Sequence, residues 1–319
     1  MEEIPERRPA VSSFGEASRR AAESLALLFP GASAPILLIR APEIVAGLSR
    51  ALKGWRPGLR PARPEDFHAP LATARPDAGG YEIASRALDR PLTGLPLASA
   101  ASALIADLAQ DFYESRPGFL GLHCGAFLAS GGLTLLLGPQ RAGKSTLIAR
   151  LSADPDLRIF CDDVLPLTPR GEGLALGAAP RLRLPLPAGA GAVLRAHLAR
   201  HGGFRDDRYA HLAAPGVAPF GMRAPLAAMV VLERREGIAP ALSPLPAEEA
   251  AAHLRAQSMG RPEPEAASRI ADLAGSLLRL KLRYAELEPA AALLRRTFLA
   301  APEARPWSGL LKRLRPFTE

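Results

Sequence analysis

Residues 138–145 read Gly138-Pro139-Gln140-Arg141-Ala142-Gly143-Lys144-Ser145 and fit the pattern Gly-x-x-x-x-Gly-Lys-[Ser/Thr]. The apolar run 133–137 precedes this loop, and a helix-like run beginning with Thr146 follows it. In such a strand–loop–helix unit the loop N–H groups and the helix N-terminus hold phosphates, the lysine reaches the β- and γ-phosphates, and the last hydroxyl ligates Mg²⁺. The segment therefore predicts that residues 138–146 bind a nucleoside triphosphate, taken as ATP, with Mg²⁺ on Ser145.

Lysine is scarce in this chain, which has 40 basic residues but only four lysines, Lys53, Lys144, Lys281 and Lys312. A lysine at this point of an arginine-rich sequence indicates that a compact ammonium group is needed there. The competing interpretation is a glycine-rich turn that binds nothing.

Composition narrows the class of protein. A chain of 319 residues with 48% hydrophobic content is expected to form one large domain and a smaller one. It has no apolar stretch of the length of a membrane span, no signal-peptide pattern and only two cysteines, Cys124 and Cys161, which predicts a soluble cytoplasmic protein. The net charge is +8, but the arginines are dispersed and aromatic residues are few, which favours a solvated arginine-rich surface over nucleic-acid binding.

The order of apolar and polar runs predicts two domains that are divided at the break 115–118. Residues 1–115 are predicted to form a small N-terminal α/β domain, with helices at 18–29, 43–52 and 98–113, a strand at 35–39 and an exposed connection at 56–75. Residues 116–319 are predicted to form the nucleotide-binding domain. Its predicted strands are 120–129, 133–137, 157–161, 173–176, 181–184 and 227–232, with a hairpin turn at 130–132 and a mainly helical last third at 247–259, 265–278 and 289–298.

Two adjacent acidic residues follow the predicted strand 157–161. Asp162 and Asp163 lie eighteen and nineteen residues after Lys144, which is enough for a helix, a turn and a return strand. One carboxylate there would orient or deprotonate an attacking hydroxyl, and the other would hold a metal directly or through water. The alternative is a solvated acidic turn. His123, twenty-one residues before Lys144, is on its own more typical of a structural histidine than of a catalytic one.

The absence of certain residues argues against several classes of nucleotide-binding protein. The chain contains no asparagine, so it has neither the Asn-Lys-x-Asp guanine reader of GTPases nor the catalytic-loop asparagine of eukaryotic-type protein kinases. The string 130–133, Ser-Gly-Gly-Leu, precedes the phosphate loop, whereas the signature of transporter ATPases follows it. That string is therefore interpreted as part of a hairpin.

Four segments together resemble one enzyme family. The runs 122–126, Leu-His-Cys-Gly-Ala, 138–146, 161–164, Cys-Asp-Asp-Val, and 180–185, Pro-Arg-Leu-Arg-Leu-Pro, resemble the catalytic domain of HPr kinase/phosphorylase and its relatives. The similarity covers roughly residues 118 to 300. It implies an α/β fold similar to phosphoenolpyruvate carboxykinase, in which a mixed sheet carries the phosphate loop, and a reaction that phosphorylates a serine hydroxyl.

The resemblance also implies roles for residues. It places Asp162 at the general base, Asp163 at the second acidic position, next to the metal, and His123 at the assisting histidine. Lys144 and the rest of 138–146 fall on the phosphate and Mg²⁺ sites, and Arg223 falls near the transferred phosphate. Self-association into a homo-oligomer is a further expectation of this family.

The sequence departs from the family at three places. Arg141 stands where a third glycine is usual, the longer signature linked to phosphorolysis is absent after Pro185, and residues 1–115 do not match the regulatory domain. Reverse phosphorolysis and HPr itself as substrate are therefore not carried over.

The sequence as a whole predicts an ATP- and Mg²⁺-dependent kinase that transfers the γ-phosphate to a hydroxyl, namely a serine of a small protein or peptide. Two alternatives stay open. One is a small-molecule hydroxyl kinase with the same machinery, and the other is a non-catalytic module that uses ATP to order a partner surface.

Overall fold

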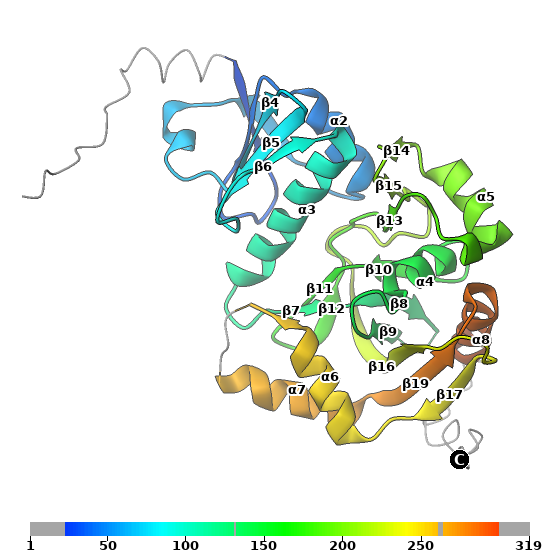
Figure 1. Cartoon of the computed structure of the whole chain (residues 1–319). Coiled ribbons are helices and arrows are strands. Elements are labelled where there is room, and N and C mark those ends of the chain that lie inside the picture. Colours follow the sequence, from blue (N-terminus) through cyan, green and yellow to red (C-terminus); the bar gives the residue numbers. More distant parts are fainter. Residues whose placement is uncertain (1–22, 131, 261–263, 300–319) are drawn as a thin grey trace, which may run out of the picture.

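A computed structural model describes residues 23–130, 132–260 and 264–299 (Figure 1). These residues form three β-sheets of six, ten and three strands, combined with α-helices. Parallel and antiparallel strand pairs occur in both larger sheets, so the predicted α/β class with a mixed sheet is confirmed. Within the described residues, no helix is long and apolar enough to cross a membrane.

The N-terminal sheet has the strand order β3-β1-β2-β4-β5-β6, and only β2 and β4 run parallel. Helices α2 and α3 pack on it through a hydrophobic core that includes Ile44, Leu104 and Ile83. The elements are β1 (Ser24–Leu28), β2 (Ile36–Ile39), α2 (Glu43–Ala51), β3 (Gly58–Pro61), the 3-10 helix η1 (Pro64–Phe67), β4 (Ala72–Asp77), β5 (Gly80–Ser85), β6 (Leu92–Leu95) and α3 (Leu97–Glu114).

Two predictions for this region were wrong. A helix was predicted over 18–29, but Ser24–Leu28 is strand β1, which pairs with both β2 and β3, while 18–22 lie outside the described residues. An exposed connection was predicted over 56–75, but it contains β3 and the start of β4. Strand β3 lies at the edge of the sheet with mostly exposed side chains, so its composition is that of a loop. Strand β2 and helices α2 and α3 are confirmed.

The ten-stranded sheet is organised around the twelve-residue strand β16 (Arg223–Arg234). Its first three residues pair with β12, and its later part runs parallel to β9 on one side and to β19 on the other. The remaining strands are β7 (Leu120–His123), β8 (Gly125–Ala129), β9 (Gly132–Leu137), β10 (Arg158–Cys161), β11 (Val164–Leu167), β12 (Glu172–Leu174), β17 (Ala241–Pro244), β18 (Ser258–Met259) and β19 (Leu278–Tyr284).

The predicted strand 120–129 is interrupted at Cys124, which separates β7 from β8. Strands β10 and β11 are interrupted in the same way at Asp162 and Asp163. The two interruptions lie side by side, because the Cys124 N–H donates to the Asp163 carbonyl oxygen at 3.0 Å. The acidic pair therefore occupies the point where two halves of the large sheet meet.

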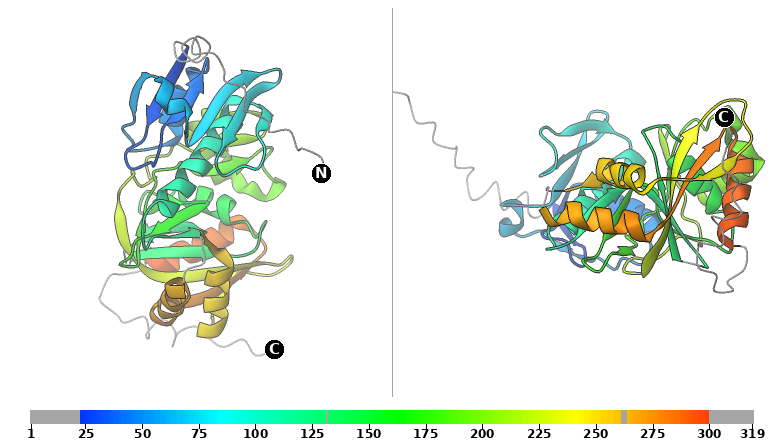
Figure 2. Two further views of the ribbon diagram at one scale, coloured as in Figure 1. Left: turned by 90° about the vertical axis from the view of Figure 1, so that its left-hand side faces the viewer. Right: turned by 90° about the horizontal axis from the view of Figure 1, so that it is seen from below.

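Helices cover both faces of the large sheet, as the right-hand view of Figure 2 shows. One face packs on a core shared with α4, α5 and α8, and the other on a core shared with α6 and α7. The predicted C-terminal helices are confirmed, but β17 and β19 were missed. The helices are α4 (Lys144–Leu151), α5 (Gly191–His201), α6 (Ala247–Gln257), α7 (Pro264–Ser276) and α8 (Leu287–Leu299), with the 3-10 helix η2 (Ala188–Ala190) before α5.

The third sheet has the order β13-β15-β14 and lies between α3 and α5 (Figure 1). Its strands are β13 (Arg181–Arg183), β14 (Phe204–Arg205) and β15 (Tyr209–His211). Both β14 and β15 contact α3. The small sheet thus connects the N-terminal part of the chain with the part that carries the phosphate loop.

The N-terminal part is also held directly against the large sheet. The Trp55 ring stacks on Phe220 with centroids 3.6 Å apart, and its indole N–H donates to Leu176 O. The Lys53 ammonium group donates to the carbonyl oxygens of Pro215 at 2.6 Å and Val217 at 2.8 Å.

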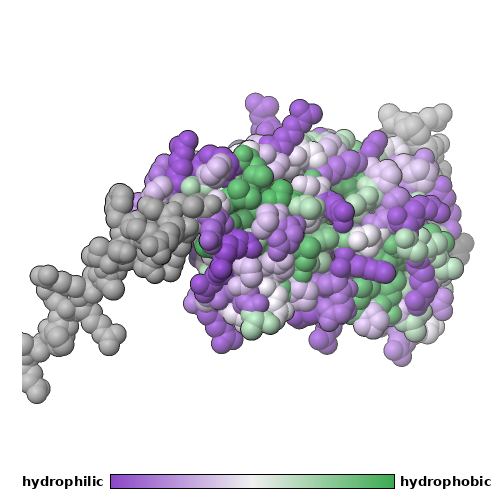
Figure 3. Space-filling view, turned by 90° about the horizontal axis from the view of Figure 1, so that it is seen from above, coloured by the Kyte–Doolittle hydropathy of each residue, from purple (hydrophilic) through white to green (hydrophobic). Residues whose placement is uncertain are grey.

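Seen from above, the surface is mostly hydrophilic, with smaller hydrophobic areas between polar side chains (Figure 3).

Candidate nucleotide-binding and phosphoryl-transfer site

The loop 138–143 connects the C-terminal end of β9 to the N-terminus of α4. Gly138 and Gly143 have φ values of 149° and 93°, and Arg141 has φ 67°. A side chain at Gly143 would collide with the Tyr284 hydroxyl, which donates to Ala142 O at 2.7 Å. The loop thus has the left-handed residues and close backbone packing of a tight phosphate-binding turn.

Lys144 is the first residue of α4 and lies folded back against the loop. Its ammonium group donates to Gly138 O at 2.8 Å and Pro139 O at 3.3 Å. The side chain is only 7% exposed, and this burial lowers the pKa of Lys144. The ammonium group is thus held by the carbonyl oxygens of the first two loop residues, next to the N-terminus of α4.

Ser145 contacts the end of β10. Its hydroxyl lies 3.5 Å from the carbonyl oxygen of Asp162, so the first turn of α4 and the acidic pair are neighbours. The predicted spacing of helix, turn and return strand does bring the acidic residues next to the phosphate loop.

Asp162 points into the protein. It is 8% exposed, and its carboxylate accepts the Arg181 backbone N–H at 2.8 Å. Burial, followed by the charge of the neighbouring Asp163, raises the pKa of Asp162 to about 7. Such a carboxyl group exchanges its proton near neutral pH.

Asp163 is half exposed and forms two charged contacts. One carboxylate oxygen lies 3.3 Å from His123 Nε2, and the other lies 3.7 Å from the Arg181 guanidinium group. The hydrogen bond from His123 is the main cause that lowers the pKa of Asp163, against the opposing effect of burial. Asp163 is therefore an anion at neutral pH. His123 is 43% exposed, which places it in the site and not in a core.

The adjacent carboxyl groups thus differ in chemistry. Environments that move two neighbouring pKa values apart separate a proton acceptor from a permanent anion. Asp162 has the properties of the first, and Asp163, which remains charged, has those of a cation ligand.

Arg223 is not brought to this site. It begins β16, whereas the loop follows the end of β9, and Val231 of β16 is the residue opposite Leu137. Eight residues of strand separate Arg223 from Val231, which is roughly 25 Å at about 3.3 Å per residue. Its position therefore gives no support to the predicted contact with a transferred phosphate.

Two cavities border the phosphate loop. Gly143 and Thr146 line a small one beside Tyr284. Residues 139–142 line a larger one of about 450 Å³ against the C-terminal end of β16, Lys281 in the middle of β19, and helix α6. Cavities at the carboxyl ends of parallel strands are the common ligand sites of open α/β sheets.

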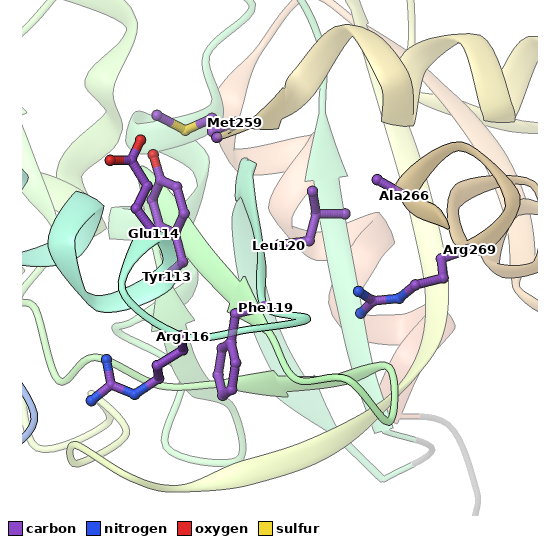
Figure 4. A pocket seen from close by; sticks show the side chains of 9 residues that line it. Tyr113, Glu114, Arg116, Phe119, Leu120, Met259, Ala266 and Arg269 are labelled. Carbon is purple, nitrogen blue, oxygen red and sulfur yellow. The ribbon is translucent and has the colours of Figure 1, made fainter. Parts of the chain in front are cut away.

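A further cavity lies where α3 leads into β7, against Met259 and helix α7 (Figure 4). It is small, about 50 Å³, and its arginines are already engaged. Arg269 donates to Gly118 O and Thr168 O, and Arg116 donates to Phe112 O and Gly31 O. These cations stabilise the junction between the two parts of the chain.

Sequence reasoning missed Arg181 as a site residue. Its backbone N–H binds Asp162 and its guanidinium group lies beside Asp163. The run 180–185, one of the four segments of the family resemblance, was the sequence signal that could have identified Arg181. Tyr284, whose hydroxyl supports the loop, had no local signal.

No group of three or more His, Cys, Asp or Glu side chains forms a cation site within 23–130, 132–260 and 264–299. A phosphate-loop Mg²⁺ needs fewer protein ligands, because substrate phosphates and water complete its shell. The Ser145 hydroxyl and the anionic Asp163 fit that limited role.

Comparisons with protein-family models and with curated proteins found no match to this chain.

Proposed function

We propose that this protein is an ATP- and Mg²⁺-dependent kinase that transfers the γ-phosphate to a serine hydroxyl of a small protein or peptide. The observation that carries the proposal is the contact between the phosphate loop and the acidic pair. The Ser145 hydroxyl in the first turn of α4 lies 3.5 Å from the carbonyl oxygen of Asp162, directly after β10, and the preceding residue, Lys144, binds the loop carbonyl of Gly138. Phosphate binding and proton transfer would thus be combined in one place.

In this proposal, residues 138–146 bind the triphosphate through backbone N–H groups and the α4 N-terminus. Lys144 would exchange its loop carbonyls for β- and γ-phosphate oxygens. Ser145 and Asp163 would hold Mg²⁺, which neutralises charge on the phosphate oxygens when it is bound.

Asp162 would accept the proton of the acceptor hydroxyl as its oxygen bonds to the γ-phosphorus. The bond from the γ-phosphorus to the bridging oxygen then breaks and ADP leaves. The pKa of Asp162 near 7 suits this task, because a general base works best close to the operating pH. His123 would hold Asp163 in place through their 3.3 Å contact.

The resemblance to HPr kinase/phosphorylase supports the same function and, with it, a fold similar to phosphoenolpyruvate carboxykinase. Arg141 has the left-handed backbone conformation expected where that family usually has a glycine. The substitution thus keeps the backbone geometry and adds a cation to the loop.

The test is to incubate the protein with γ-labelled ATP and Mg²⁺ in a cell extract, with Lys144→Ala as control. Label on serine of extract proteins, lost in the control, is the expected result. Label on small molecules only would favour a small-molecule kinase. ATP binding without any transfer would favour a nucleotide-gated module and contradict the kinase assignment.

A further inference from the structure

The small sheet presents basic side chains next to the acidic pair. Arg181 and Arg183 lie two residues apart on β13, so they share one face of the sheet. In the register of the sheet Arg183 is opposite Tyr209 of β15, which therefore lies on the same face. Leu182 and Ala210 are buried on the other face.

Two guanidinium groups lie near the Tyr209 ring. The Cζ atoms of Arg181 and Arg208 are 5.0 Å and 5.8 Å from its centroid, which is within cation–π range. We call Arg181, Arg183, Arg208 and Tyr209 the arginine platform. Arg183 and Arg208 are exposed, and in the part of the chain that the structure describes no carboxylate forms an ion pair with either of them.

The platform is fixed by the N-terminal part of the chain. The Asp206 carboxylate accepts the backbone N–H groups of Arg208 and Tyr209 at 2.8 Å, and it also accepts the N–H and hydroxyl of Ser99 in α3 at 2.8 Å. A second tie joins Ser102 of α3 to His211 at 3.0 Å. The backbone that carries Arg208 and Tyr209 is thus fixed before any partner arrives, which reduces the entropic cost of binding.

We propose that the arginine platform binds carboxylates of the phosphoacceptor, so that the acceptor is an acidic protein or peptide segment. This inference rests on the proposed function. Arginine pairs with carboxylates in a bidentate geometry. Arg181 already faces Asp163, but Arg183 and Arg208, which form no ion pair within the described residues, leave their positive charge uncompensated. The net charge of +8 would also speed the encounter with an acidic partner.

The geometry gives the spacing of the recognised residues. Arg181 lies at the Asp163 carboxylate, and Arg183 is two residues, or roughly 7 Å, further along the strand. An extended acceptor peptide advances about 3.3 Å per residue. Its acidic residues are therefore expected about two to four positions from the phosphorylated serine.

The first test uses synthetic peptides with one serine flanked at these positions by Glu, Ala or Lys. The wild type is expected to phosphorylate the Glu peptides with kcat/KM at least about tenfold above the Lys peptides. In the double variant Arg183→Glu/Arg208→Glu this preference should be lost or reversed. Arg170→Glu, an exposed arginine in the turn between β11 and β12, is the matched control and should keep the preference.

A second test does not depend on catalysis. Fluorescent polyglutamate is titrated with the wild type, the double variant and the control, and binding should weaken at least about tenfold in the double variant alone. Equal binding by all three proteins would overturn the platform, even if extract proteins are phosphorylated. Tighter binding of single-stranded RNA than of polyglutamate would overturn it in favour of a nucleic-acid surface. If the double variant lost ATP affinity to the same extent as polyglutamate affinity, the proposal would be overturned, because these arginines would then bind the nucleotide.

Discussion

Replacing Asp162 by asparagine should stabilise the folded protein and impair phosphoryl transfer. The carboxyl pKa rises from 3.8 to about 7 on folding, so folding favours the protonated form. The stabilisation is complete below pH 3.8 and is lost as the pH rises through 7. At 1.36 kcal/mol per unit, the raised pKa lowers the unfolding free energy, relative to its contribution below pH 3.8, by roughly 2 kcal/mol at pH 5.5 and roughly 4 kcal/mol at pH 8.5.

An asparagine side chain at this position would have no such cost, and its oxygen would still accept the Arg181 N–H. The gain in unfolding free energy of Asp162→Asn over wild type should therefore grow by about 2 kcal/mol between pH 5.5 and 8.5. Any constant cost of the buried amide cancels in this comparison. Urea unfolding followed by circular dichroism measures it, with the surface variant Asp156→Asn as control. A gain that is flat or shrinks with pH would refute the buried-carboxyl reasoning.

The same variant tests the role of Asp162 as base. ATP should still bind, but single-turnover transfer to a saturating acceptor should fall by about two to four powers of ten. Transfer by the wild type should rise with pH through about 7, since the base must be ionised, and the variant should lack this rise. Transfer at the wild-type rate would show that Asp162 is not the base.

Three further predictions concern the neighbouring residues. Lys144→Ala should abolish ATP-dependent activity while the circular dichroism spectrum stays native, and wild-type ATP affinity and turnover in this variant would contradict the phosphate-loop assignment. Ser145→Ala and Asp163→Asn should each raise the Mg²⁺ concentration needed for half-maximal activity, so unchanged metal titrations would argue against both as ligands. His123→Ala should slow transfer more than it weakens ATP binding, with little change in melting temperature because the ring is half exposed. A large loss of stability with normal activity would instead make it a structural histidine.

The local parts of the site could be predicted from the sequence because they are contiguous. The residue types of the loop 138–145 specify its backbone conformation locally. The strand before it and the helix after it can be predicted from apolar runs. The placement of Asp162 and Asp163 next to this loop could also be predicted. Only one helix and one strand lie between the loop and the acidic pair, and so short a connection allows few paths of the chain.

Contacts that depend on sheet register could not be predicted. Arg223 was assigned to the phosphate site, but its distance from the loop depends on how β16 pairs with β9, which no local pattern specifies. The spacing of apolar residues around Ser24–Leu28 also fits one side of a helix, and only pairing with β2 and β3 makes this segment a strand. Arg181 joins the site through a sheet formed by distant segments.

The interruption between β10 and β11 gives a physical reason for the opposite pKa shifts of two adjacent acids. Asp162 and Asp163 form a bend between the two strands, and at this meeting point of two half-sheets one carboxyl is buried and the other is half exposed. Asp162 loses solvent and its pKa rises, whereas Asp163 meets His123 and Arg181 and its pKa falls. A continuous strand would instead place such a pair within the ladder. Because Cys124 interrupts the neighbouring strand at the same level and bonds to Asp163 O, the break is shared by both strands. We infer that the shared break, more than either acidic residue alone, gives the two carboxyl groups the different surroundings that their proposed roles as proton acceptor and metal ligand require.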